Sequence, residues 1–415
     1  MKKLIGTVAV AAMLATAAFA EGISFGSWGR ALWIVGTAQE ADNGDNTVTS
    51  WLGQSWGGPS PRVGLSVSGS SDNMGFNVDF HANGNGGIDL GDNCLVWSKP
   101  IEMLKIIFAG KNDQNILRGD SCFGLWNWDR IGAVGVEGEE GWTFPAILNR
   151  NVTIVATPIE GLTVGAGVDC LLGSWGGLAP AEAANERFVD QIGRQSAIAA
   201  AYSISNIGTA KIGFRGLGKG YDKEGGYNAD RKDAFEFDAA FEFTMLEKVF
   251  IAAGVRMPLG GTFGEATDLY EDGDLYAWNT KPVMVTLHSR LSLIDNLTIN
   301  VLAGLKLNSA DLGATPADFK ASGAFGFRFG GEVEYGFSNG LGVFAEVEYA
   351  NGIWMASSSA DNKDTLTFGL GATKGFSNGV IGVAFEGTTN NYGRQALKNA
   401  DDFAWEVPFK MEYWF

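Results

Sequence analysis

The end of the chain, FAWEVPFKMEYWF over residues 403–415, places an apolar side chain at every second position. Successive side chains of a β-strand point to opposite faces, so this period of two predicts a strand with one wholly apolar face. An apolar edge of this length is one that soluble proteins avoid. The alternative is a strand with lipid on one side and water on the other.

The beginning of the chain, residues 1–20, has the pattern of a bacterial secretory signal peptide. Lys2 and Lys3 form a short basic region, an apolar stretch follows, and Ala18-Phe19-Ala20 is a small-x-small cleavage site. We expect cleavage before Glu21, which leaves residues 21–415 as a single domain. No later stretch has the length and apolarity of a membrane-spanning helix.

The composition narrows the function classes. A net charge of −17 argues against a nucleic-acid partner, and the 59 glycines with 12% aromatic residues suit many strands joined by turns. No nucleotide-binding motif and no Cys/His metal spacing occurs, so we expect neither cofactor nor metal. Cys94, Cys122 and Cys170 permit one disulfide, and the sequence does not decide whether any pair is bridged.

The alternation of the terminal stretch recurs along the chain. Residues 62–83 predict a hairpin with one apolar and one polar face, and DAFEFDAAFEF over residues 233–243 places Phe237 on the lipid side and Asp238 on the water side. Short turns are expected near Asp72, 100–102, 159–160, Asn206, 246–247, Asp295, 338–339 and 377–378, and long loops at 38–60, 113–148, 171–193, 217–231, 258–281 and 389–402.

Short turns on one side and long loops on the other are typical of a transmembrane antiparallel up-and-down β-barrel. The short turns, together with a first strand around 23–35 and a last strand at 403–415, predict about 18 strands, with 16 as the alternative. The fold class is therefore all-β, with short periplasmic turns and long extracellular loops. A barrel of this size leaves an aqueous channel.

These features together resemble the bacterial outer-membrane porins, and the hairpin sequences are similar to those of spirochaete porins. In that group a final Phe preceded by apolar residues at alternate positions is recognised by the barrel-assembly machinery. Phe415, Tyr413, Met411 and Phe409 match this signal. The resemblance implies an outer-membrane location in contact with the lipid bilayer and with lipopolysaccharide or an equivalent lipid. It further implies passive diffusion of small hydrophilic solutes, and it allows a homotrimer.

Alternation and the resemblance together give a set of candidate pore-lining residues. In porins the third long loop folds inward, which brings residues of 113–148 into the set. The charges predict either a hydrated wall or a transverse field at a constriction. The candidates are Arg30, Arg62, Asp79, Lys105, Lys111, Arg118, Asp120, Asp129, Arg130, Lys211, Glu236, Asp238, Arg256, Arg290, Arg328, Glu332 and Glu334.

The 13 tryptophans fall into two groups. Those near predicted strand ends are expected in the interfacial girdle of the membrane: Trp28, Trp33, Trp97, Trp405 and Trp414. Loop tryptophans such as Trp126, Trp128 and Trp142 suit either a sugar-stacking track, as in sugar-selective porins, or packing between loops.

Two other function classes stay open at this point. A barrel enzyme needs a general base, and the two histidines, His81 and His288, are both expected to face the lumen as ordinary wall residues. We therefore expect no enzymatic activity. A surface adhesin or structural outer-membrane barrel is the other alternative, and conductance measurements would separate it from a channel.

Overall fold

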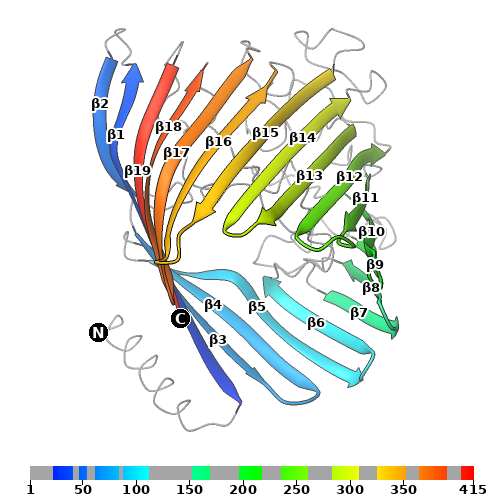
Figure 1. The fold of residues 1–415 in the computed structure, drawn as a ribbon. Coiled ribbons are helices and arrows are strands. Elements are labelled where there is room, and N and C mark those ends of the chain that lie inside the picture. Colours follow the sequence, from blue (N-terminus) through cyan, green and yellow to red (C-terminus); the bar gives the residue numbers. More distant parts are fainter. Residues whose placement is uncertain are drawn as a thin grey trace, which may run out of the picture.

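The computed structural model describes the strands and short turns of one continuous antiparallel sheet (Figure 1). The described residues are 22–40, 46–53, 61–83, 87–111, 152–168, 196–216, 235–259, 283–307, 325–351, 364–389 and 403–415. Residues 1–21, which include the predicted signal peptide, and 112–151, which include the predicted constriction loop, lie outside this set. Within the described part, no helix is long and apolar enough to cross a membrane.

The strands of the first half are β1 (Ile23–Glu40), β2 (Asn46–Gly53), β3 (Arg62–Ser70), β4 (Met74–Asn83), β5 (Ile88–Ile101), β6 (Leu104–Lys111), β7 (Val152–Ile159), β8 (Leu162–Val168) and β9 (Ser196–Ile204). Those of the second half are β10 (Gly208–Gly216), β11 (Phe235–Phe243), β12 (Val249–Leu259), β13 (Val283–Ile294), β14 (Leu297–Leu307), β15 (Phe325–Gly336), β16 (Leu341–Ala350), β17 (Thr365–Phe376), β18 (Gly379–Thr389) and β19 (Phe403–Trp414).

The barrel is closed and has 18 strands, which confirms the predicted fold class over the alternative of 16. The segments β2 and β3 together count as one strand of the barrel, because β3 pairs with the beginning of β1 and β2 pairs with the end of β1. This corrects the predicted loop at 38–60, since β1 continues to Glu40 and 46–53 is strand. Thr47, Val48 and Thr49 in β2 are β-branched, and such residues favour a pleated strand over a loop.

All eight predicted short turns join consecutive strands, the shortest being 102–103, 160–161, 295–296 and 377–378. Two of these four turns contain a residue with a left-handed backbone. These residues are Gly161 and Asn296, with φ angles of 79° and 65°.

The seam between β1 and β19 closes the barrel. Pro408 in β19 has no N–H to give to the ladder, and prolines within sheets are confined to edges or bulges. The β1–β19 register shifts between Ile34 and Gly36, where Ile34 faces Pro408, so the seam accommodates the proline at an irregularity. At the end of the seam, Phe415 and Ser27 exchange two backbone hydrogen bonds of 2.7 and 3.0 Å.

The outer face of the barrel is an apolar band. Large side chains such as Ile198, Leu370 and Phe329 are more than half exposed, although each lies at the middle of an ordered sheet. A soluble protein does not leave an apolar surface of this extent uncovered. The arrangement is that of a membrane β-barrel, with strands that present their apolar residues outward.

Candidate functional site

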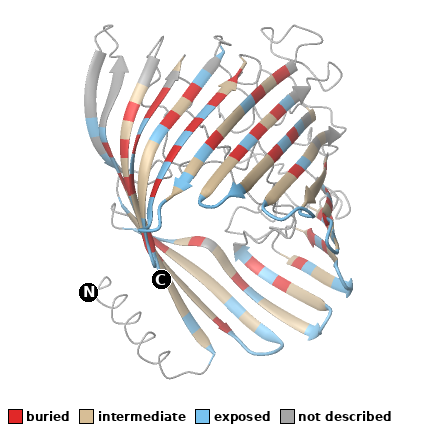
Figure 2. Cartoon of the chain, viewed as in Figure 1, coloured by how far each residue is buried: buried red, intermediate tan, exposed pale blue. Residues whose placement is uncertain are grey.

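Charged and polar side chains lie on the inner face of the barrel. The strand β16 shows the alternation clearly, because Val343, Ala345 and Val347 are exposed while Phe344, Glu346 and Glu348 are buried. Figure 2 shows the same alternation of buried and exposed positions on the neighbouring strands. The buried polar set is His81, Thr153, Lys211, Asp238, Thr286, His288, Asn300, Arg328, Glu332, Glu346, Glu348, Thr367, Glu386, Glu406 and Lys410.

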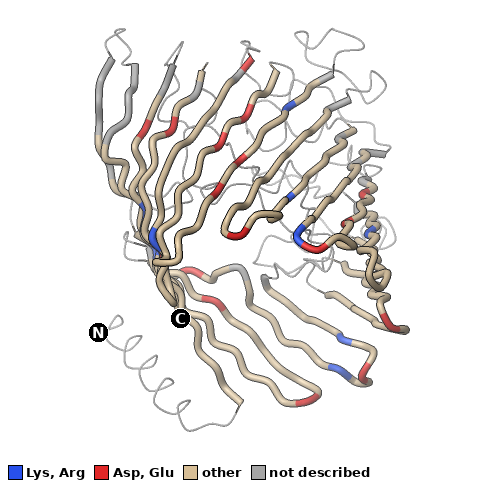
Figure 3. The backbone as a smooth tube through the Cα atoms, in the orientation of Figure 1, with Lys and Arg blue, Asp and Glu red and all other residues tan. Residues whose placement is uncertain are grey.

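Four of the buried carboxylates form one row across neighbouring strands. Glu332 on β15 is directly opposite Glu346 on β16, and Glu386 on β18 is directly opposite Glu406 on β19. Gly369 on β17 stands between the two pairs, opposite both Glu346 and Glu386. We call Glu332, Glu346, Glu386 and Glu406 the acidic row. Figure 3 shows acidic positions gathering on these strands.

The single glycine in this row has a packing role. A Cβ at Gly369 would lie 2.9 Å from Oε1 of Glu346, so the Glu346 side chain lies over this glycine of β17. At the other end of the row, Asn300 Nδ2 donates a 3.0 Å hydrogen bond to Oε1 of Glu332. Like charges directly opposite one another repel. The row places four carboxyl groups on neighbouring strands of the inner wall.

The strands β1, β3 and β4 carry a basic cluster instead. Arg30 is directly opposite Arg62, and both guanidinium groups lie near the ring of Trp28, at 5.1 and 5.7 Å from its centroid. Arg62 also donates a hydrogen bond to Nδ1 of His81, whose ring makes an edge contact with Trp28 at 5.0 Å. Arg30 forms an ion pair with Glu412.

Further charges of both signs lie on β10 to β15. Lys211 forms an ion pair with Glu242, and Asp238 is directly opposite Arg256 in the β11–β12 ladder. Arg290 lies 6.0 Å from the ring centroid of Phe250, and Arg328 is buried on β15. The wall therefore holds separate acidic and basic sectors together with paired charges.

Of the predicted pore-lining residues, ten are described with their side chains. The structure places Arg30, Arg62, Asp79, Lys105, Lys211, Asp238, Arg290, Arg328, Glu332 and Glu334 at inward positions of their strands. Lys111, Glu236 and Arg256 belong to strands, but the described residues do not include their side chains. Arg118, Asp120, Asp129 and Arg130 fall outside the described residues, as do Trp126, Trp128 and Trp142.

Three of the five predicted girdle tryptophans, Trp28, Trp97 and Trp414, are at inward positions of their strands, and Trp414 is directly opposite Trp28 in the β1–β19 ladder. Trp97 packs against the buried inner residues Leu95 and Ile107, and Trp28 contacts His81, so both face inward. The alternation in the sequence contains a signal for the inner face, because Trp28 is two residues from Arg30 and Trp97 is two residues from Lys99. Trp33 and Trp405 are on the outer face, where Trp405 stacks on Phe385.

Several residues of the inner wall were not among the predicted pore-lining residues. Glu386, Glu406 and Lys410 are each no more than 2% exposed and were not among the candidates. The alternation of the last strand carried a signal for two of them, because Glu406 and Lys410 stand between the apolar residues of its outer face. The contribution of Gly369 became visible only with the strand register.

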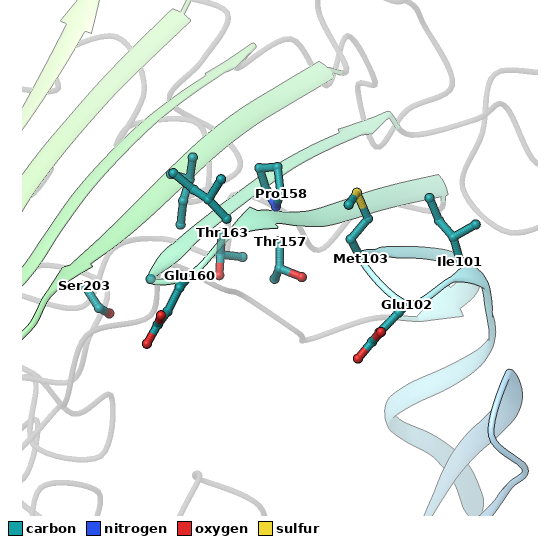
Figure 4. A pocket seen from close by; sticks show the side chains of 11 residues that line it. Ile101, Glu102, Met103, Thr157, Pro158, Glu160, Thr163 and Ser203 are labelled. Carbon is teal, nitrogen blue, oxygen red and sulfur yellow. The ribbon is translucent and has the colours of Figure 1, made fainter.

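A pocket of about 720 Å³ lies at the short-turn end, between the β5–β6 and β7–β8 hairpins. Both turns contain the sequence Pro-Ile-Glu, and the Thr157 N–H donates a 2.9 Å hydrogen bond to the Met103 carbonyl. Figure 4 shows the Glu102 and Glu160 side chains pointing the same way, away from Met103 and Pro158. The pocket thus has one acidic side and one apolar side at the rim of the barrel.

Both histidines pack against other residues of the inner wall. His81 is buried against Arg62 and Trp28, and His288 is fully buried with its ring 5.7 Å from that of Phe250. Their surroundings are those of packed wall residues, with an aromatic ring against each imidazole.

No protein-family model and no curated protein matches the sequence. Among solved structures, the fold is similar to the "anion-selective porin from Comamonas acidovorans", with a TM-score of 0.50 and 11% identity over 95% of this chain and 100% of that chain. A triple mutant of the Rhodopseudomonas blastica porin matches with a TM-score of 0.46 and 13% identity, over 94% of this chain and 100% of that one. The first of these likenesses shows a porin-type β-barrel fold.

Proposed function

We propose that the protein is an outer-membrane porin that allows passive diffusion of small hydrophilic solutes and ions. The observation that carries this proposal is the closed 18-stranded barrel with charged residues on its inner face and an apolar outer band. A barrel of this strand number is wide enough to enclose water. Charged side chains on an inner wall are hydrated, so the path of the solute stays filled with water.

The apolar outer band supports a place in a lipid bilayer. The predicted signal peptide at 1–20 directs export, and a barrel exported by a bacterium is inserted in the outer membrane. The partners in this proposal are the bilayer, lipopolysaccharide or an equivalent lipid, and the barrel-assembly machinery that recognises the C-terminal strand. A homotrimer is the assembly that the porin resemblance implies.

The charge distribution on the wall supports a mild preference for cations. The acidic row lies on β15 to β19, whereas the Arg30–Arg62 cluster lies across the seam on β1 and β3. A row of carboxylates raises the local cation concentration within about 8–10 Å at physiological salt. The Arg30–Arg62 cluster attracts anions to its own part of the wall, so the preference for cations is mild.

Liposome swelling tests the channel proposal directly. Proteoliposomes containing the folded protein are diluted into iso-osmotic solutions of neutral sugars of increasing size. We expect swelling rates that fall steadily with solute size, because diffusion through a water-filled bore is limited by fit. Swelling equal to that of protein-free liposomes for every sugar would refute the proposal.

A further inference from the structure

Two inward tryptophans, Trp28 and Trp97, are built into the wall in the same way. A Cβ at Gly75 on β4 would lie 2.6 Å from the Trp97 ring, and a Cβ at Gly64 on β3 would clash with the Trp28 ring. Each indole therefore lies against the backbone of a glycine on the neighbouring strand, a position that only glycine permits. The indole orientations are fixed by the sheet itself.

Each of these indoles has two cationic side chains near it. Lys105 and Lys99 have their Nζ atoms 5.1 and 5.7 Å from the Trp97 ring centroid. Arg30 and Arg62 stand at the same two distances from the Trp28 ring. We call Trp97, Lys99 and Lys105 the Trp97 station, and Trp28, Arg30 and Arg62 the Trp28 station. The two stations share a sector of the inner wall formed by β1 and β3 to β6.

The two cations of each station lie beside the same indole ring. Arg30 and Arg62 are directly opposite each other in the β1–β3 ladder, an arrangement in which like charges repel. Glu412 forms an ion pair with Arg30 and offsets part of this repulsion. At the Trp97 station two lysines approach one ring from the two strands of the β5–β6 hairpin. A carboxylate placed between two such cations forms charge-assisted hydrogen bonds with both.

We propose that the two stations bind small carboxylates that carry a six-membered ring, and guide them along this sector of the lumen. The ring would contact the indole while the carboxylate lies between the two cations. Neither a neutral ring nor a ringless anion makes both contacts. The inference rests on the proposed channel function, since a solute must enter the lumen to reach either station.

The Trp97 station is the stronger of the two. Its indole also packs against Leu95, Ile107 and Ala109, so little freedom is left to lose when a ligand binds. The acidic row on β15 to β19 repels the same carboxylates from that sector. Such anions are therefore expected to bind on the side of the lumen that carries the two stations and not on the side of the acidic row.

Two ring classes share this chemistry, and the binding experiment separates them. Benzoate and glucuronate are titrated into the detergent-folded full chain, each beside its neutral counterpart, benzyl alcohol or glucose, with acetate as the ringless anion. Saturation-transfer NMR measures binding whether or not the barrel conducts. We expect at least one ring carboxylate to bind about fivefold more tightly than its neutral counterpart and than acetate. The one that binds identifies the ring class. Equal binding of acetate, or no preference over the neutral ring, would overturn the proposal.

Variants locate the site. Trp97→Leu keeps an apolar side chain against Leu95 and Ile107, and the double variant Lys99→Gln, Lys105→Gln removes only charge. Each should weaken ring-carboxylate binding roughly fivefold. The control Trp405→Leu, on the outer face, should leave binding unchanged. If both station variants match the wild type, or if the control weakens binding equally, the stations do not bind these solutes.

A current measurement keeps this inference separate from the channel proposal. In planar bilayers, the ring carboxylate that binds should increase current noise or block the open channel of the wild type more than that of Trp97→Leu. A channel that conducts without any such difference defeats the stations alone. A barrel that never conducts defeats the channel proposal, while the NMR result still decides whether the stations bind.

Discussion

Arg30 on the first strand and Glu412 on the last strand form an ion pair across the barrel seam, with 2.8 Å between Nε and Oε1. The two residues are also directly opposite in the β1–β19 ladder, so the side chains reinforce the backbone pairing. Their side chains are 28% and 14% exposed, which places the pair at a partly solvated position of the inner wall. Closure of the barrel thus has a charged component as well as a hydrogen-bonded one.

Replacing either partner of this pair should weaken the seam. Arg30→Gln and Glu412→Gln each remove one charge, and a double-mutant cycle isolates their coupling. We expect a coupling of about 1 kcal/mol in the free energy of unfolding, since the pair is partly solvated. Urea unfolding in detergent micelles measures it. A coupling of zero would show that backbone pairing alone holds the seam.

Arginine on the outer face should destabilise the barrel, whereas arginine on the inner face should not. Leu370 is 62% exposed at the middle of β17, so Leu370→Arg would place a charge in lipid at a cost of about 2–4 kcal/mol. Thr373 on the same strand faces inward between Gly342 and Gly382, which leave room for a larger side chain. Unfolding of Leu370→Arg and of Thr373→Arg in lipid vesicles compares the two faces. Equal destabilisation would mean that the assigned faces of β17 are incorrect.

The last residue is predicted to matter for assembly more than for stability. The Phe415 side chain is 79% exposed, so its deletion removes little packing and the two backbone hydrogen bonds to Ser27. We expect deletion of Phe415 to reduce insertion in cells severely, with refolding in detergent largely retained. Phe376→Ala removes an exposed aromatic side chain at the same end of the barrel and serves as the control. Normal membrane levels of the deletion variant would contradict an assembly role for the C-terminal strand.

Neutralising the acidic row should lower the cation preference that we propose for this barrel. Glu386→Gln and Glu406→Gln preserve side-chain shape and remove charge from two directly opposed positions. Reversal potentials under a salt gradient should shift toward that of a less cation-selective channel, and the double variant should shift further than either single one. Glu247→Gln, on the β11–β12 turn, should have little effect. An unchanged reversal potential in the double variant would exclude the acidic row from selectivity.

Much of the fold could be predicted because a lipid-facing strand leaves a local signature. The alternation around Phe237 and in the last strand depends on neighbouring residues only, and the short turns contain residues such as Asn206 and Asn296 that favour a left-handed backbone. The strand 46–53 was missed because the first loop was expected to begin at residue 38, whereas β1 continues to Glu40 and pairs with it there.

The composition of the inner wall was harder to predict than its location. Trp28 and Trp97 were expected at the membrane interface because tryptophan is common there, yet glycines on neighbouring strands accommodate both rings inside. The acidic row depends on the register of five strands, from Glu332 on β15 to Glu406 on β19. Such long-range register is not contained in the alternation of any one strand.

Planar-bilayer recording tests the central claim most directly. Purified, detergent-folded protein added to one side of a bilayer should produce stepwise increases in current, with a conductance that rises in proportion to salt concentration, as expected for a water-filled bore. Heat-denatured protein at the same detergent concentration is the control. Discrete steps from the folded protein alone are the predicted result, and a bilayer that stays silent although the inserted barrel is detected in it would contradict the account.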